Sequence, residues 1–178
     1  QGFGAVRLTL INEILGRSPW APIVFGTQAP DTGNAEILAR FGTKEQKDSY
    51  LAGLLSGEIF SCFSMTEPQG GSDPRVFTTS AVRDGDTWVI NGHKYFSSNA
   101  SVASFFIVVA VTDPDVPVHH GASTFLIPAG TPGLTVAATH HLVGSLPHEA
   151  GHSLVHYENV RVPGSAMLGE PGHGFEIL

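Results

Sequence analysis

The hydrophobic pattern of this chain changes near Ile59, and that change constrains the fold more than any other feature of the sequence. Residues 1–58 carry apolar side chains at helical spacing, and Leu8 and Ile11 are among those that fall on one helical face. From Ile59 onward, short apolar runs are separated by glycine and proline. The sequence therefore predicts an α+β chain, in which an N-terminal α-helical segment precedes an antiparallel β-sandwich or barrel of about seven strands.

The helical part is expected to contain successive short helices. One includes residues 8–15, and another includes residues 35–41 and follows a loop at residues 29–33. Thr43 and Gln46 have the spacing of a capping box, in which each side chain bonds to the backbone N–H of the other residue. This pair predicts the start of a further helix that ends at a glycine.

Turn dipeptides and apolar runs indicate where the strands lie. Asp84-Gly85 predicts a hairpin between strands at residues 76–82 and 87–90, and Asn91-Gly92 predicts a second turn directly afterwards. Residues 105–111 are uninterruptedly apolar, which predicts a strand buried on both faces. Further strands are expected at residues 122–127, 134–138 and 153–156.

Composition excludes several classes of function. The net charge of −7 and the absence of a Lys/Arg cluster argue against a nucleic-acid partner. Cys62 is the single cysteine, so neither a disulfide framework nor a cysteine-based zinc site is expected, and a reducing cytoplasm is favoured. No apolar run reaches the roughly 18 residues that a membrane span requires.

The run FSMTEPQGGSD at residues 63–73 follows the apolar stretch at 59–62 and has the composition of a binding loop. Glycine allows the backbone to approach a ligand closely. Successive N–H groups, together with the hydroxyls of Thr66 and Ser72, form a donor set suited to phosphate or to ring carbonyl oxygens. The run therefore predicts a ligand-binding loop, although Gly-Gly-Ser alone is also typical of an ordinary polar turn.

Three strings together resemble the acyl-CoA dehydrogenase family. They are FSMTEPQGGSD at residues 63–73, DGDTWVINGHKYFSSN at 84–99, and ENVRVP at 158–163 followed by GHGF at 172–175. The family's usual forms are Thr-Glu-Pro with Gly-Ser-Asp, then Asn-Gly-x-Lys ending in Trp-Ile-Thr-Asn. The strings occur in the family's order, and the likeness is good from about Phe41 to Leu178.

The resemblance implies a domain division. Residues 1–58 would be part of an N-terminal helical domain, 59–163 a flavin-binding middle β domain, and 164–178 the start of a C-terminal helical domain that is otherwise absent. The apolar ending of the chain, with nothing to cover it, is consistent with a piece of a longer protein. The family's catalytic base is a glutamate in that absent domain, so no catalytic residue is expected in this chain and the base is expected beyond Leu178.

The resemblance also implies FAD as cofactor and assigns residues to it. Phe63, Met65 and Thr66 would line the flavin ring, with Thr66 donating to the pyrimidine edge. Gly71 and Ser72 would meet the pyrophosphate, and Ser72 would also border the substrate. Phe96 and Ser98 stand where the family has a ring-packing Trp and a Thr whose hydroxyl bonds flavin N5. The expected flavin-binding set is Phe63, Met65, Thr66, Gly71, Ser72, Phe96 and Ser98.

The implied reaction is α,β-dehydrogenation of an acyl-CoA thioester. A carboxylate would remove the α-proton while hydride leaves the β-carbon for flavin N5. The implied partners are an electron-transfer flavoprotein and further copies of the chain, in a dimer or tetramer. Because Phe-Ser-Ser replaces Trp-Ile-Thr at residues 96–98, a divergent branch with an unusual substrate is indicated. A flavin-dependent oxidase or monooxygenase on the same fold, and a non-catalytic β module, remain alternatives.

A zinc hydrolase is the alternative from a different class. His148, Glu149 and His152 fit the H-E-x-x-H pattern of zinc peptidases. That pattern requires a stable helix, which Pro147 just before it and Gly151 within it disfavour. We therefore expect no metal site, and we expect substitution of His152 to leave flavin chemistry intact. Another candidate carboxylate, Glu67, is expected to hold a turn together and not to act as a base.

Overall fold

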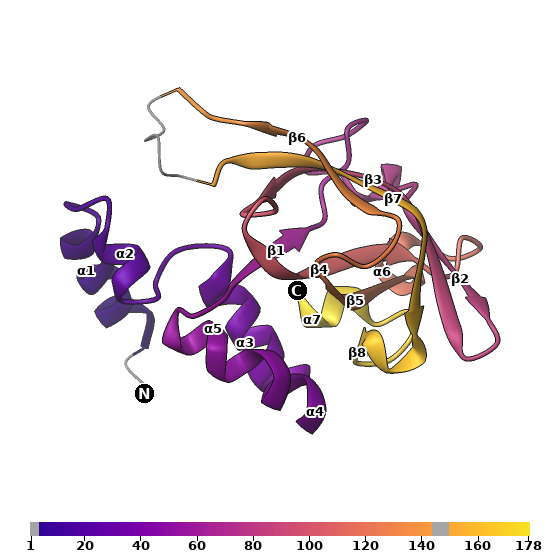
Figure 1. Cartoon of the computed structure of the whole chain (residues 1–178), viewed down its shortest axis with the longest axis horizontal. Coiled ribbons are helices and arrows are strands. Elements are labelled where there is room, and N and C mark those ends of the chain that lie inside the picture. The colour runs from indigo at the N-terminus through magenta and orange to yellow at the C-terminus, as the bar shows by residue number, and fades with distance from the viewer. Residues whose placement is uncertain (1–3, 144–149) are drawn as a thin grey trace.

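The computed structural model describes residues 4–143 and 150–178 (Figure 1). The α+β class is confirmed, because helices occupy the N-terminal part and a sheet occupies the remainder. The N-terminal helices are α1 (Gly4–Leu15), α2 (Ala21–Val24), α3 (Asp31–Phe41), α4 (Lys44–Gln46) and α5 (Ala52–Ser56), with the π-helical segment η1 (Lys47–Leu51) between α4 and α5. The later short helices are η2 (Pro74–Val76), α6 (Val118–Gly121), η3 (Gly164–Ala166) and α7 (Gly174–Ile177).

The capping box is present as predicted. The Thr43 hydroxyl accepts a hydrogen bond from the Gln46 backbone N–H at 3.2 Å, and the Gln46 side chain accepts one from the Thr43 backbone N–H at 2.9 Å. The continuous helical stretch that begins there ends at Gly57, whose φ of 75° lies in the left-handed region that glycine adopts without strain.

Helix α3 begins earlier than predicted, because residues 31–33 are helical and not part of a loop. The Asp31 carboxylate accepts hydrogen bonds from both the backbone N–H and the hydroxyl of Ser61, at 2.7 and 2.6 Å. The Asn34 amide donates to the same hydroxyl at 2.8 Å. These contacts fix the first turn of α3 against the sheet, and such long-range contacts are invisible in a local sequence pattern.

The described residues form one eight-stranded sheet in the order β6-β7-β3-β1-β4-β5-β8, with β2 pairing with β3 and β4. Most pairs are antiparallel, as predicted, but β1 and β2 each run parallel to β4 where they pair with it. The strands are β1 (Phe60–Ser64), β2 (Ser80–Asp84), β3 (Thr87–Ser98), β4 (Ala103–Val111), β5 (Ala122–Pro128), β6 (Leu134–His140), β7 (His152–Pro163) and β8 (Met167–Leu168).

Two local predictions about β2 and β3 are wrong. Residues 76–79 are not part of a strand, since β2 begins at Ser80. Asn91-Gly92 is not a turn, because β3 continues through it with an irregularity in its pairing to β7. A Cβ at Gly92 would lie 2.4 Å from the Thr79 hydroxyl oxygen, so glycine serves a close approach between chain segments here. The predicted hairpin between β2 and β3 is confirmed.

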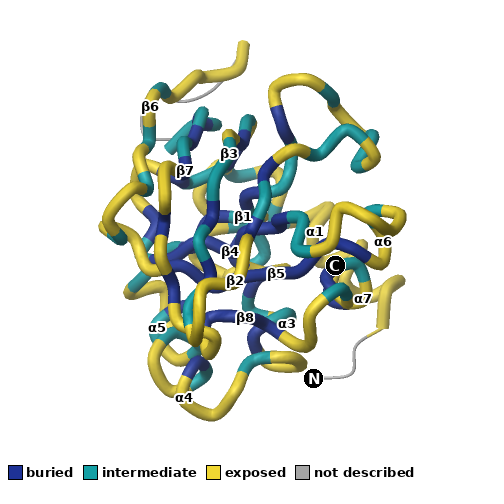
Figure 2. Tube along the Cα trace, turned by 90° about the vertical axis from the view of Figure 1, so that its right-hand side faces the viewer, coloured by how far each residue is buried: buried dark blue, intermediate teal, exposed yellow. Residues whose placement is uncertain are grey.

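Strand β4 is buried along most of its length, as the dark blue of its trace in Figure 2 shows, and the predicted burial on both faces is confirmed. Its alternating side chains enter two different cores. Phe106 and Val108 pack in a cluster that lies within the sheet domain. Phe105 and Ile107 point the other way and join a cluster that includes Leu38 of α3. The helices therefore cover one side of β4 and hold the end of β1 in place.

Among the described residues, no helix has both the length and the hydropathy needed to cross a bilayer.

Candidate functional site

A cavity of about 480 Å³ lies where α3 faces the ends of β1 and β3. Its volume is within the range of ordinary ligand sites. Five of the sequence-predicted residues line it, because β1 and β3 pair with Phe63 directly opposite Ser98. They are Phe63, Met65, Thr66, Phe96 and Ser98. Residues from two separate motifs are thus brought to one place by strand pairing.

Phe96 is presented to this cavity by an unusual backbone. Its φ of 53° is in the left-handed region, which bulky residues rarely adopt, and the residue is 52% exposed. The pairing of β3 with β7 is irregular between Lys94 and Ser97, which redirects the side chains there. The Phe96 ring lies 4.1 Å from the Tyr95 ring, measured between centroids. Backbone strain combined with exposed aromatic surface is typical of ligand-binding sites.

The chemistry of the lining fits a planar heteroaromatic ring. Phe63, Tyr95 and Phe96 offer aromatic surface, and Thr66 and Ser98 offer hydroxyl groups that can donate or accept hydrogen bonds. A flavin ring has apolar faces and a polar edge with both donors and acceptors. The residues present are therefore suited to hold FAD.

Gly71 and Ser72 do not line this cavity and belong to the turn that follows Glu67. A Cβ at Gly71 would meet none of the described atoms within 4 Å, so the space beside this backbone is open. Ser72 has a φ of 61°, which is uncommon for a residue other than glycine. The turn thus leaves room for a ligand group near Gly71, outside the cavity that Phe63 and Ser98 line.

Glu67 organises the loop behind the cavity, as the sequence predicted. Its carboxylate is buried and accepts hydrogen bonds from the backbone N–H groups of Thr78 and Thr79, at 2.7 and 3.0 Å. The Lys94 ammonium group lies 2.8 Å from Glu67 Oε1 and 2.7 Å from the Met65 carbonyl oxygen, to which it donates. Because Met65 lines the cavity, this ion pair connects the turn to the cavity wall.

The buried ion pair perturbs the pKa of both partners. Burial raises the pKa of Glu67, but the Lys94 charge and the donated hydrogen bonds outweigh this effect and hold the pKa at about 2. Burial lowers the pKa of Lys94, and the Glu67 charge offsets the fall only in part, which leaves the pKa at about 8. Glu67 is therefore a firmly ionised carboxylate and is poorly suited to accept a proton from a substrate.

The other reactive candidates that the structure describes do not form a site. Cys62 is buried, and burial raises the pKa of its thiol, which makes it a poor nucleophile. Among the described residues, no group of three or more metal-binding side chains gathers. His148 and Glu149 lie outside the described residues, and His152 is the first residue of strand β7. The helix that a zinc peptidase needs therefore does not continue to its second histidine.

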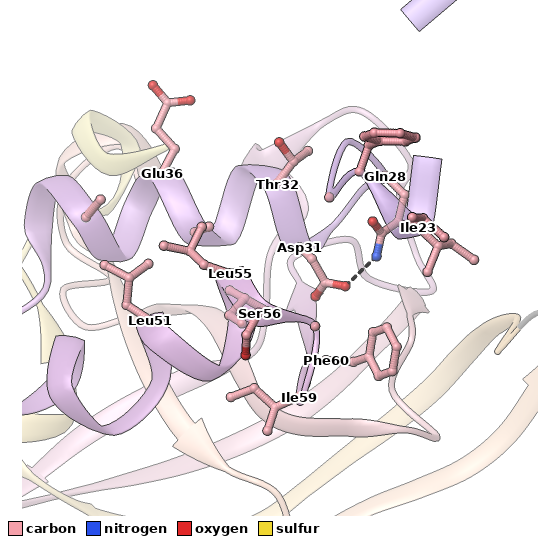
Figure 3. A pocket seen from close by; sticks show the side chains of 17 residues that line it. Ile23, Gln28, Asp31, Thr32, Glu36, Leu51, Leu55, Ser56, Ile59 and Phe60 are labelled. Atoms are coloured by element: carbon pink, nitrogen blue, oxygen red, sulfur yellow. Dashed lines mark hydrogen bonds between the residues drawn. The ribbon is translucent and has the colours of Figure 1, made fainter. Parts of the chain in front are cut away.

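A larger cavity, of about 680 Å³, lies between α2, α3 and α5 (Figure 3). Apolar side chains such as Ile23, Leu55 and Phe60 line it, and Gln28 donates a hydrogen bond of 2.7 Å to Asp31 beside it. None of the sequence-predicted site residues lines it. The larger cavity is therefore not the one to which the sequence motifs point.

Several residues of the candidate site were missed by sequence reasoning. Tyr95 lies between two motif positions and was assigned no role. Helix α3 contributes Thr32, Gly33, Asn34 and Ile37 to the cavity wall. The helical pattern of residues 35–41 was visible, but nothing in it indicated which element α3 faces.

Comparison with known proteins gives consistent matches. Residues 62–160 match the model of the acyl-CoA dehydrogenase middle domain, and residues 1–58 match that of the acyl-CoA dehydrogenase N-terminal domain. Acyl-CoA dehydrogenase family member 10 of Mus musculus is 40% identical over 179 residues, which is 99% of this chain and 17% of the relative. The chain thus spans about a sixth of the length of that relative.

Two solved structures of acyl-CoA dehydrogenases are also similar to this chain. A putative acyl-CoA dehydrogenase from Mycobacterium abscessus superposes with a TM-score of 0.88 at 41% identity, over 94% of this chain and 42% of that one. A glutaryl-CoA dehydrogenase from Mycobacterium smegmatis, solved in complex with FADH2, superposes with a TM-score of 0.70 at 35% identity, over 81% of this chain and 35% of that one.

Proposed function

Because this chain belongs to the acyl-CoA dehydrogenase family, we propose that it holds FAD for the α,β-dehydrogenation of an acyl-CoA thioester. The observation that carries the proposal is the convergence of Phe63, Met65, Thr66, Phe96 and Ser98 on one cavity. The complex of the related glutaryl-CoA dehydrogenase with FADH2 supports the choice of cofactor.

The residues of this chain would bind and orient the cofactor. Phe63, Met65 and Phe96 would pack against the ring, and Thr66 would donate to its pyrimidine edge. Ser98 would bond N5. When bound, FAD supplies the acceptor for the hydride that leaves the substrate β-carbon. The aromatic wall would also keep water from the ring faces.

Other parts of the proposal concern groups outside the cavity. Gly71 and Ser72 would meet the pyrophosphate, and Ser72 would also border the acyl-CoA; the open space beside Gly71 supports the approach of such a group. None of the residues of this chain is proposed as the base that removes the α-proton. Electrons would pass to an electron-transfer flavoprotein, and the intact protein would form a dimer or tetramer. A cytoplasmic location is proposed from the free thiol of Cys62.

Anaerobic reduction tests the proposed reaction. The intact protein, loaded with FAD, is mixed without oxygen with a panel of acyl-CoA thioesters of different length and branching. We expect at least one of them to bleach the absorbance of the oxidised flavin and to yield the enoyl-CoA. A flavin that stays oxidised with every thioester would contradict the proposal. Rapid reoxidation of the reduced protein by oxygen would favour the oxidase alternative.

A further inference from the structure

Ser98 has a partner that the family resemblance did not indicate. Strand β7 pairs with β3 so that His152 lies directly opposite Ser98. The Nδ1 atom of His152 is 2.8 Å from the Ser98 hydroxyl oxygen, and the contact is partly buried. The contact joins His152 to a residue of the expected flavin-binding set, which argues against the expectation that substitution of His152 leaves flavin chemistry intact. The two residues are separated by 54 positions in the sequence, so only strand pairing brings them together.

The contact matters because a serine hydroxyl has a single proton to donate. If Nδ1 carries a proton, it donates to Ser98, and the Ser98 proton is free to be donated into the cavity. If Nδ1 is unprotonated, Ser98 donates to it and can only accept from a group in the cavity. The tautomer of His152 thus decides whether Ser98 presents a donor or an acceptor to a ligand.

The residues described around His152 do not fix its tautomer, so the ligand and water would determine it. His152 and Ser98 both border a third cavity, of about 380 Å³, and none of the described residues that line it is charged. The titratable group in register with His152 on β6 is His140, which is exposed. A second histidine, His141, lies with its ring near Gly151, which is next to His152 in the sequence.

We infer that His152 is a positioning residue that switches the hydrogen-bonding direction of Ser98 between the two oxidation states of the flavin. The inference rests on the proposed function. Nitrogen N5 of the ring accepts a hydrogen bond when oxidised and carries a proton when reduced. Ser98 must therefore donate to the first state and accept from the second. In the neutral imidazole, this change of tautomer removes the proton from Nδ1 and adds one at Nε2 by exchange with water.

The direct test is the tautomer of His152 in the intact, FAD-loaded protein, read by ¹⁵N NMR of labelled histidine and assigned with a His152→Asn variant. We expect the Nδ1-protonated form with oxidised FAD and the Nε2-protonated form after reduction with dithionite. In Ser98→Ala, the change of tautomer on reduction should disappear. The same tautomer in both oxidation states of the unsubstituted protein would overturn the inference.

FAD affinity provides a second readout. His152→Ala should weaken FAD binding by about 2- to 12-fold, the range that corresponds to one neutral hydrogen bond. His152→Asn should restore most of the affinity, because its amide can donate or accept near the position of Nδ1. The matched control is His156→Ala on the same strand, since His156 stacks on His93 and should leave affinity unchanged.

The outcomes separate this inference from the proposed function. An intact protein that does not bind FAD would contradict the proposed function and this inference with it. FAD binding that is equally tight in His152→Ala, His152→Asn and the unsubstituted protein would overturn only the inference about His152.

Discussion

Thr66 and Ser98 are the motif residues that bring hydroxyl groups to the cavity between α3 and the sheet. Each is expected to make one hydrogen bond to the flavin ring. A neutral hydrogen bond contributes about 0.5–1.5 kcal/mol, whereas the packing of Phe63 and Phe96 against the ring does not depend on it. Removing one hydroxyl should therefore weaken binding without abolishing it.

Thr66→Ala and Ser98→Ala should each raise the Kd for FAD by about 2- to 12-fold, measured by the quenching of flavin fluorescence on titration of the intact protein. Thr135→Ala is the control, because Thr135 is an exposed residue of β6 outside the cavity. Unchanged affinity and an unchanged rate of flavin reduction in both cavity variants would contradict the assignment of these residues.

The buried pair of Glu67 and Lys94 is the feature whose disruption should be most costly. Lys94→Met leaves the Glu67 carboxylate buried without its cation, which costs about 3–5 kcal/mol in comparable buried pairs. The double variant Glu67→Gln/Lys94→Met removes both charges and should cost less than Lys94→Met alone. Urea unfolding of the unsubstituted protein, Lys94→Met and the double variant measures the differences in the free energy of unfolding. A double variant less stable than Lys94→Met would contradict the role of the uncompensated charge.

The lowered pKa of Glu67 predicts a dependence of stability on pH. Its folded-state pKa of about 2 lies below the ordinary value of 4.5, so its contribution is present above pH 4.5 and is lost as the pH falls towards 2. The contribution is on the order of 3 kcal/mol. The stability gap between the unsubstituted protein and Glu67→Gln should therefore narrow between pH 4.5 and 2. A gap that stays constant over this window would show that Glu67 is not specially stabilised in its ionised form.

At the level of elements, local signals were sufficient where the contact itself is local. The capping box at Thr43 and the hairpin between β2 and β3 involve residues close in sequence, and both were predicted. The prediction of a turn at Asn91-Gly92 is wrong because the backbone conformation there depends on residues that are distant in the sequence. Thr79 packs against Gly92, and the Asn91 side chain accepts a hydrogen bond from the Asn159 backbone N–H at 2.7 Å.

Gly92→Ala tests this account of strand β3. A Cβ there would lie 2.6 Å from the Thr79 Cα, and the φ of 149° disfavours a side chain. Overpacking of this kind typically costs about 1–3 kcal/mol, which thermal unfolding would report as a lower Tm. Gly33→Ala in α3 is the control, because a Cβ at Gly33 meets none of the described atoms within 4 Å. Equal Tm values for the two variants would contradict a close approach at Gly92.

On the scale of the whole molecule, the sequence motifs predicted the family and five of the residues that line the cavity, but not the cavity itself. Motifs at residues 63–66 and 96–98 become one site through the pairing of β1 with β3. The contributions of α3 and His152 depend on packing and pairing between distant segments, which no local pattern encodes. The larger hollow between α2, α3 and α5 was equally unforeseen.

A crystal structure of the intact protein with FAD tests the central claim most directly. The account predicts that the isoalloxazine ring lies in the cavity lined by Phe63, Thr66 and Phe96, with the Ser98 hydroxyl within hydrogen-bonding distance of N5. A ring bound elsewhere, for example in the hollow beside Leu55, would contradict it.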